Sequence, residues 1–152
     1  MAIAIGLVGF QLQPVAAAET EVEGVMSFAN RQLNKPFRLG SEGLRRYDCS
    51  GLVYRTYLEN GLLDRIGGSR KLARGYYRWF KQRGQLTNDP RKGDLVVWAK
   101  RGKRVSHIGI FQGYNKRGKP MAVSALVNPY GVTNHKVHSI SIPLKAYLDV
   151  KF

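Results

Sequence analysis

The sequence predicts an α+β fold, with helices in the first part of the chain and strands in the second. Apolar residues recur at helical spacing up to Arg83, and short runs rich in β-branched and aromatic residues follow from Asp94. The turn sequence Pro90-Arg91-Lys92-Gly93 separates the two parts. Because the chain has 152 residues and no repeat, linker or low-complexity stretch, we expect a single domain over residues 19–152.

The first residues are set apart from this domain by their composition. Residues 1–15 are almost wholly apolar, residues 16–18 are alanines, and polar residues follow. This pattern predicts a secretory signal peptide over residues 1–18 with cleavage after Ala18, although no Lys or Arg precedes the apolar run. The alternative is a buried N-terminal helix. Two glutamines and a proline interrupt the run, and a spanning helix needs about 20 apolar residues, so we expect no stable membrane span.

The apolar periodicity predicts helices over Glu21–Leu33, from Asp48 to Asn60, and over Ser69–Arg83. Asp48 can cap the second of these helices, and Asn60-Gly61 can end it. Four strands are expected in the second part, and a turn at Gly113–Gly118 is expected to join the middle two as a hairpin. The strand ranges are Asp94–Trp98, Val105–Phe111, Met121–Leu126 and His135–Ile142.

The charge balance predicts anionic surroundings for this protein. Lys and Arg number 25 and Asp and Glu number 10, which gives a net charge of +15. A nucleic acid, an acidic membrane or a cell wall rich in carboxylates and phosphates could supply the opposite charge. The hydrophobic share of 43% excludes a disordered or collagen-like chain.

Two residues carry the chemistry that the sequence suggests. Cys49 is the only cysteine, which excludes an intramolecular disulfide, and it lies at the first turn of a predicted helix, where backbone N–H groups favour a thiolate. His107 lies in a predicted strand in which Val105, His107, Gly109 and Phe111 share one face, and Gly109 is expected to leave that face open as a groove. Together they could form a nucleophile and its base. Alone, they could equally be a buried thiol and a structural histidine.

No metal or cofactor is expected. The three histidines lack the spacing of a zinc motif, and no glycine-rich phosphate loop occurs. His135 and His138 lie in a basic segment and are expected at the surface.

Four short sequence motifs occur in a fixed order along the chain. They are Lys35-Pro36-Phe37, Tyr47-Asp48-Cys49-Ser50-Gly51-Leu52-Val53, Lys92-Gly93-Asp94-Leu95-Val96 and Ser106-His107-Ile108-Gly109-Ile110-Phe111. Together these motifs resemble the NlpC family of bacterial cell-wall peptidases, which are papain-like cysteine hydrolases, and the resemblance extends from about Val22 to Val137.

The resemblance implies a papain-like α+β fold, with helices on a small antiparallel sheet and the nucleophile at a helix start. It also implies a secreted cysteine endopeptidase that cuts peptidoglycan stem peptides, usually between D-γ-glutamate and diaminopimelate or lysine. Cys49 matches the nucleophile and His107 the base. Asp48 and Ser50 match positions that help to recognise the free amine of the stem, although helix capping explains Asp48 equally well.

Three positions depart from the family pattern. Phe37 stands where a tyrosine is usual, so a hydroxyl that recognises the stem is missing and Phe37 is expected as an apolar wall of the cleft. Gly40-Ser41 replaces a Gly-Gly pair. Ser124 falls at the third catalytic position, where histidine is usual, and is expected to orient His107. The alternative for Ser124 is a strand serine that bonds its own surroundings.

A competing interpretation is a non-catalytic basic module that binds anionic polymers. Tyr76, Tyr77, Trp79 and Phe80 lie among many cations and could form a stacking surface for bases, but they could also pack in the core. No known nucleic-acid motif occurs, so no nucleic acid is expected as a partner. In the peptidase interpretation the same charge attracts anionic wall polymers. The predicted signal peptide and the family resemblance imply a location outside the cell or in its envelope. A transferase on the same scaffold would differ only in its acceptor. The cations are Arg45, Arg46, Arg70, Lys71, Arg74, Arg78, Lys81, Arg83, Lys100, Arg101, Lys103 and Arg104.

Overall fold

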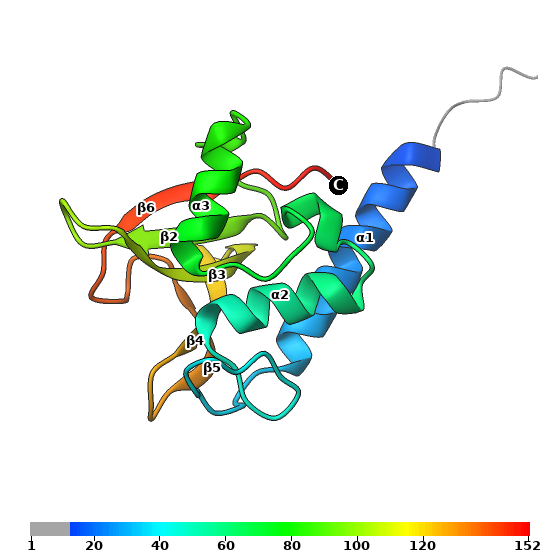
Figure 1. Ribbon diagram of the computed structural model, residues 1–152. Coiled ribbons are helices and arrows are strands. Elements are labelled where there is room, and N and C mark those ends of the chain that lie inside the picture. The colour runs from blue at the N-terminus through cyan, green and yellow to red at the C-terminus, as the bar shows by residue number, and fades with distance from the viewer. Residues whose placement is uncertain (1–12) are drawn as a thin grey trace, which may run out of the picture.

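The structure is a computed structural model that describes residues 13–152 (Figure 1). The first half of the chain forms helices, as the periodicity predicted. They are α1 (Gln13–Arg31), α2 (Cys49–Glu59), the short 3-10 helix η1 (Leu63–Ile66) and α3 (Ala73–Gln82). No helix of the described part, residues 13–152, is long and apolar enough to cross a membrane.

Helix α1 begins earlier than the expected residue, Glu21, and its first turns lie outside the core. Val15 is 61% exposed, and the first residue of the helix to be fully buried is Val25. In Figure 1 the start of α1 projects away from the rest of the domain. Most of the predicted signal peptide, residues 1–12, lies outside the described residues, and residues 13–18 belong to these projecting turns.

The second half of the chain forms a sheet, in which the described residues place six strands in the order β1-β6-β2-β3-β4-β5. All neighbours pair antiparallel. The strands are β1 (Leu86–Thr87), β2 (Leu95–Ala99), β3 (Val105–Tyr114), β4 (Pro120–Leu126), β5 (Gly131–Lys136) and β6 (Leu144–Leu148). The α+β fold class and the β3–β4 hairpin are therefore confirmed.

The expected strand His135–Ile142 is misplaced, because β5 runs over Gly131–Lys136 and the chain then leaves the sheet. Strand β6, which lies between β1 and β2, was not predicted. Its sequence Leu-Lys-Ala-Tyr-Leu carries a period-2 pattern, but it is short and follows Pro143. The two-residue strand β1 is too short to leave a pattern in the sequence.

The helices cover one face of the sheet (Figure 1). Side chains from all three α-helices pack there against alternate residues of the central strands, including Leu95, Val97, Ile108 and Ile110. The opposite face carries a second cluster around Trp98 and Phe111, which the segment after β5 covers through Val137 and Ile140. Both faces of β2 and β3 are thus buried, which fixes the two strands firmly beneath α2.

Candidate active site

Cys49 is the first residue of α2, and its position is fixed by the cap before it. Asp48 is the N-cap residue, and its Oδ1 accepts a hydrogen bond of 2.7 Å from the N–H of Gly51. The loop before the helix crosses this first turn so closely that a Cβ on Gly51 would lie 2.0 Å from the carbonyl oxygen of Ser41. The glycine of the Cys-Ser-Gly sequence is therefore required for the loop to pass. The Cys49 side chain remains partly exposed.

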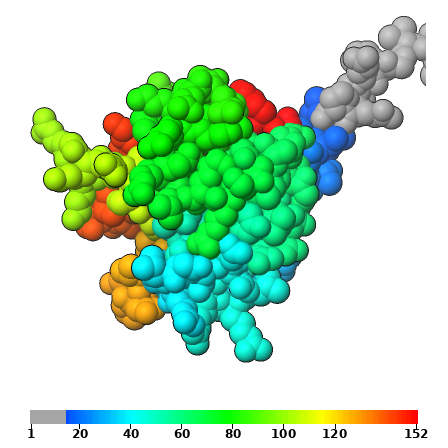
Figure 2. Space-filling model, in the orientation of Figure 1, coloured from blue at the N-terminus to red at the C-terminus, as the bar shows by residue number. Residues whose placement is uncertain are grey.

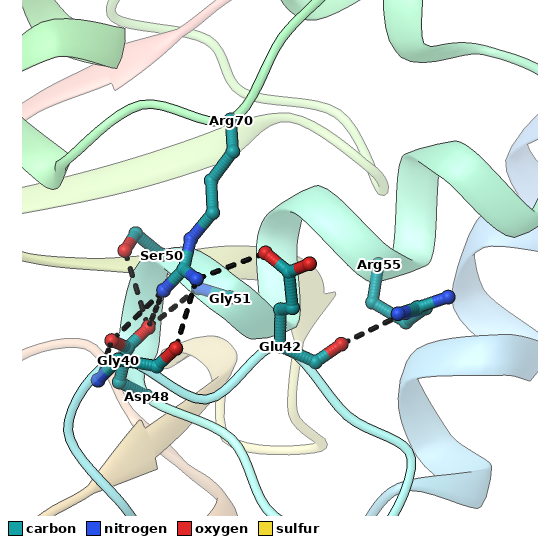
Figure 3. A network of polar contacts seen from close by, with 7 residues as sticks. All are labelled: Gly40, Glu42, Asp48, Ser50, Gly51, Arg55 and Arg70. Carbon is teal, nitrogen blue, oxygen red and sulfur yellow. Dashed lines mark hydrogen bonds and ion pairs between the residues drawn. The ribbon is translucent and has the colours of Figure 1, made fainter.

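Asp48 also forms the centre of a polar network (Figure 3). Its carboxylate accepts hydrogen bonds from the N–H of Gly40 at 2.7 Å and from the Ser50 hydroxyl at 3.2 Å. Arg70 Nη2 lies 3.0 Å from both carboxylate oxygens, and Nη1 pairs with Glu42 at 2.9 Å. Asp48 is 5% exposed. Because its Oδ1 accepts the hydrogen bond from the N–H of Gly51, the interpretation of Asp48 as a helix cap is confirmed.

His107 lies on β3, and its ring is held by a hydrogen bond from the neighbouring strand. His107 Nε2 is 2.9 Å from Ser124 Oγ on β4, and this oxygen is 2.7 Å from His135 Nε2 on β5. His135 Nδ1 is in turn 2.9 Å from the carbonyl oxygen of Lys136. The structure thus places Ser124 beside His107, as the sequence predicted. His135 is 8% exposed, so its expected surface position is wrong, whereas His138 is exposed.

The two histidines share one face of the sheet with Trp98. The Trp98 ring centroid is 5.1 Å from that of His107 and 5.8 Å from that of His135. The expectation that Gly109 opens a groove is wrong. A Cβ there would lie 2.9 Å from Cβ of Ser124 and 3.4 Å from the Trp98 ring, so the missing side chain makes room for these neighbours.

Val105 also differs from its expected place. The register of β3 against β2 shifts between Trp98 and Ala99, where Trp98 pairs with His107 and Ala99 pairs with Val105. This irregularity moves Val105 into the helix-side core, while Phe111 packs on the opposite face. The extra residue of β3, Ser106, lies directly before His107, and bulges of this kind re-aim side chains beside functional sites.

Cys49 and His107 line the same cleft, which has a volume of about 1130 Å³. Asp48, Ser50 and His135 also reach its lining, and Phe37 forms part of its wall, as the sequence predicted. Phe37 also packs against the buried Tyr47 and Leu52 cluster. Within residues 13–152, no group of three or more His, Cys, Asp or Glu side chains is placed to hold a metal ion.

Burial controls the protonation of the two central side chains. It raises the pKa of the Cys49 thiol above its ordinary value, and hydrogen bonds from the N–H groups of Ile108 and Ser50 offset this only in part. Burial, with the nearby His135 as a second cause, lowers the pKa of His107 to about 4. The free protein therefore holds a neutral thiol and a neutral imidazole at neutral pH. The sequence predicted that the helix terminus would favour a thiolate at Cys49, but the effect of desolvation on the pKa is larger.

The surface around the cleft is basic. The tip of the β2–β3 hairpin, residues 100–104, is exposed, and three of its cations line the cleft: Lys100, Lys103 and Arg104. Figure 2 shows this tip (yellow-green) standing out from the domain on the same side as the turn between β4 and β5 (orange).

The aromatic side chains of α3 do not form a stacking surface. Tyr76 and Phe80 are fully buried in the core, and Tyr77 and Trp79 are partly buried against it. The guanidinium of Arg83 lies 4.0 Å from the centroid of the Trp79 ring. The core interpretation is therefore confirmed for Tyr76 and Phe80, while Tyr77 and Trp79 pack partly against the same core.

The sequence interpretation missed two residues of the site. Arg70 lies far from Asp48 along the chain and counted only as one cation among many, so no local pattern signalled their pairing. His135 carried a usable signal, because strand alternation over Gly131–Lys136 places Gly131, Thr133 and His135 on one face. The misplaced strand boundary hid this signal.

Comparisons with known proteins agree with this geometry. The sequence model of the NlpC/P60 family matches residues 34–138, which is more than half of the chain. Among solved structures, the domain is similar to NlpC1 from Trichomonas vaginalis, with a TM-score of 0.67 and 24% identity. The match covers 86% of this chain and 44% of that one, so this chain spans less than half of the length of NlpC1.

Two further structures are similar over most of the chain. The NlpC/P60 domain of the peptidoglycan hydrolase SagA has a TM-score of 0.59 and 19% identity, over 85% of this chain and 98% of that one. The peptidoglycan hydrolase RipB from Mycobacterium tuberculosis has a TM-score of 0.60 and 21% identity, over 100% and 75%. At these identities the likenesses establish the fold. With the match of the family model, they show that the chain belongs to the NlpC/P60 family.

Proposed function

We propose that this chain is a cysteine peptidase that hydrolyses an amide bond in the stem peptides of peptidoglycan. One observation carries the proposal: Cys49 and His107 line the same cleft, and Ser124 holds the His107 ring. Family membership adds support, because SagA and RipB are described as peptidoglycan hydrolases.

The proposed reaction is acyl transfer to sulfur followed by hydrolysis. His107 takes the proton of the Cys49 thiol as the sulfur attacks the substrate carbonyl, whose π electrons move to its oxygen. The intermediate collapses, the C–N bond breaks, and His107 returns the proton to the leaving amine. Water then attacks the thioester as His107 takes one of its protons. The C–S bond breaks, the carboxylic acid product is released, and His107 returns the proton to the sulfur, which regenerates the thiol. The N–H groups of Cys49 and Ser50, which point toward the sulfur, are suited to stabilise the oxyanion.

His107 must therefore act as a general base during the attack. Burial raises the pKa of the thiol and lowers that of the imidazole, so a resting thiolate–imidazolium pair is disfavoured. A substrate that fills the cleft places its carbonyl beside the sulfur. The negative charge that develops on the carbonyl oxygen then stabilises the imidazolium that forms during the attack. In this proposal the ion pair exists only along the reaction.

The scissile bond that we propose joins D-γ-glutamate to diaminopimelate or lysine, by resemblance to the family. Phe37 is proposed as an apolar wall of the substrate site, since it is half-buried in the lining of the cleft. Ser50 and Asp48 are proposed to border the end of the site that receives the first residue of the stem. An amine bound by Asp48 would have to compete with Arg70 for its oxygens.

We also propose that the protein acts in the cell envelope or outside the cell, after removal of residues 1–18. The core supports this, because among residues 15–31 of α1, whose burial the structure describes, the buried ones all follow Ala18. The exposed cations of residues 100–104 are proposed to hold anionic wall polymers near the cleft.

Digestion of purified peptidoglycan with the chain from Glu19 onward tests the proposal, with products identified by mass spectrometry. The expected products carry new free amino termini on diaminopimelate or lysine. The matched control is Cys49→Ala, which removes one small, partly exposed side chain and should leave the circular dichroism spectrum and wall binding nearly unchanged. Released sugars, or equal turnover by the alanine variant, would contradict the proposal. Wall binding without cleavage by either protein would favour the non-catalytic module.

A further inference from the structure

A series of hydrogen bonds leads from His107 through Ser124 and His135 to the carbonyl oxygen of Lys136, which can only accept. The carbonyl oxygen of Lys136 already accepts from the N–H of Ser139 at 3.0 Å and from its hydroxyl at 2.8 Å, so its position is fixed. His135 Nδ1 lies 2.9 Å from this same oxygen. Since a carbonyl oxygen has no proton to give, His135 must carry its proton on Nδ1.

This one assignment determines the others. Burial lowers the pKa of both histidines, so each is neutral at neutral pH and has a single N–H group. With its proton on Nδ1, His135 can only accept at Nε2, and the Ser124 hydroxyl must donate to it over 2.7 Å. The hydroxyl has one proton, so toward His107 it can only accept. His107 therefore donates from Nε2, and its Nδ1 is unprotonated.

We propose that His135 is a positioning residue that acts through Ser124 and keeps His107 in the tautomer whose Nδ1 is free to accept the thiol proton. The proposal rests on the proposed function only in taking His107 as the base. It adds a second residue behind the serine, contributed by the next strand of the sheet.

The reason why Ser124 alone is insufficient lies in the freedom of its hydroxyl. A serine hydroxyl rotates and can donate or accept with equal ease. Without an acceptor at the position of His135 Nε2, the Ser124 proton can turn toward His107 Nε2. His107 would then carry its own proton on Nδ1, which is the nitrogen left to accept the thiol proton in the proposed reaction because Ser124 engages Nε2. His135 excludes this arrangement because its Nε2 accepts the hydrogen bond from the Ser124 hydroxyl.

The tautomer can be measured without substrate. In ¹⁵N-labelled protein from Glu19 onward, nitrogen chemical shifts distinguish the protonated from the unprotonated ring nitrogen of each histidine. We expect His107 to carry its proton on Nε2 and His135 on Nδ1. In His135→Leu, we expect the His107 signals to move toward a mixture of both tautomers. A His107 proton on Nδ1 in the unsubstituted protein would overturn the proposal, whether or not the protein cleaves peptidoglycan.

The kinetic test is a double-mutant cycle on a stem-peptide substrate. If His135 acts only through Ser124, Ser124→Ala and His135→Leu should each lower kcat about tenfold with little change in KM, and the double variant should lose no more than Ser124→Ala alone. His135→Gln, whose amide oxygen can accept the hydroxyl proton, should recover most of the loss. His138→Leu is the control, since His138 is exposed and lies close to His135 in sequence.

Two outcomes would overturn the positioning role. Additive losses in the double variant would mean that His135 acts independently of Ser124, for example by packing against Trp98. Full activity and an unchanged His107 tautomer in His135→Leu would mean that the serine needs no partner. If His135→Leu does not fold, the tautomer of the unsubstituted protein and the His135→Gln variant still decide the matter.

Discussion

Arg70 Nη2 contacts both carboxylate oxygens of Asp48, the residue that caps α2, at 3.0 Å. Asp48 also accepts from two backbone N–H groups and from Ser50, which fills the acceptor positions that a carboxylate offers. The charge that the family resemblance assigns to recognition of a substrate amine is thus already neutralised within the protein.

Replacing Arg70 tests what this pairing does to specificity. We expect Arg70→Met to raise kcat/KM for stem peptides with a free amine relative to the same peptides with the amine acetylated, because the Asp48 carboxylate becomes available. The pair is largely buried, so we also expect a loss of about 2 kcal/mol in the free energy of unfolding. Arg74→Met, on an exposed position that lines the cleft, is the control. An unchanged preference would mean that the amine does not bind at Asp48.

Phe37→Tyr separates a cleft residue from a core residue. Phe37 is only half-buried and lines the cleft, so a new hydroxyl can point to solvent or substrate. We expect a shift in stem-peptide preference and a melting temperature close to that of the unsubstituted protein. An unsatisfied buried hydroxyl would instead cost about 1–3 kcal/mol, which a melting curve detects easily. Such a drop would place Phe37 in the core.

Alkylation of Cys49 by iodoacetamide should follow the protonation of the thiol. Because burial raises the pKa of Cys49, we expect slow labelling at neutral pH, with a rate that rises about tenfold for each pH unit between about pH 6 and about pH 9. The thiolate that the sequence predicted at this helix start would instead label fast at neutral pH. A fast rate that is already constant below about pH 7 would instead show a resting thiolate–imidazolium pair.

His107 should make the domain less stable in acid. Its pKa is about 4 in the folded protein, below the ordinary 6.5, so the unfolded chain binds more protons between these values and stability falls as pH decreases through this window. The full loss is about 3 kcal/mol. Asp94, whose pKa burial raises to about 6, changes stability in the opposite direction, but it is present in every variant. Urea unfolding at about pH 7 and about pH 4.5 should show a smaller difference for His107→Gln. An equal difference would contradict the assignment.

The basic hairpin tip should matter for polymeric substrate and not for chemistry. We expect Lys103→Glu/Arg104→Glu to lower kcat/KM on whole peptidoglycan at low salt, with little effect on a short stem peptide and less effect as salt rises. The matched control is Lys116→Glu/Arg117→Glu on the exposed turn of the β3–β4 hairpin, which does not line the cleft. Equal losses in both variants would assign the effect to net charge.

The sequence predicted the elements that local patterns encode. Cys49 at the start of a helix follows from the cap Asp48 and the apolar spacing behind it, and the place of Ser124 beside His107 follows from strand alternation and one hairpin. What it could not predict depends on contacts between distant segments. The Arg70–Asp48 pair needs the loop before α3 to fold back over α2. The protonation of Cys49 depends on how deeply it is buried, and a sequence pattern does not report burial depth.

The proposed base and nucleophile belong to two different mechanical parts of the domain. His107, Ser124 and His135 come from three adjacent strands, so their mutual geometry is as rigid as the strand register. Cys49 lies on α2, which packs on the sheet through apolar contacts such as those of Val53 on the helix and Ile108 on β3. The distance from sulfur to imidazole is therefore a packing distance between helix and sheet. A core substitution that leaves the domain folded can therefore still lower the rate of the chemical step, because it shifts α2 by a few tenths of an ångström relative to the sheet.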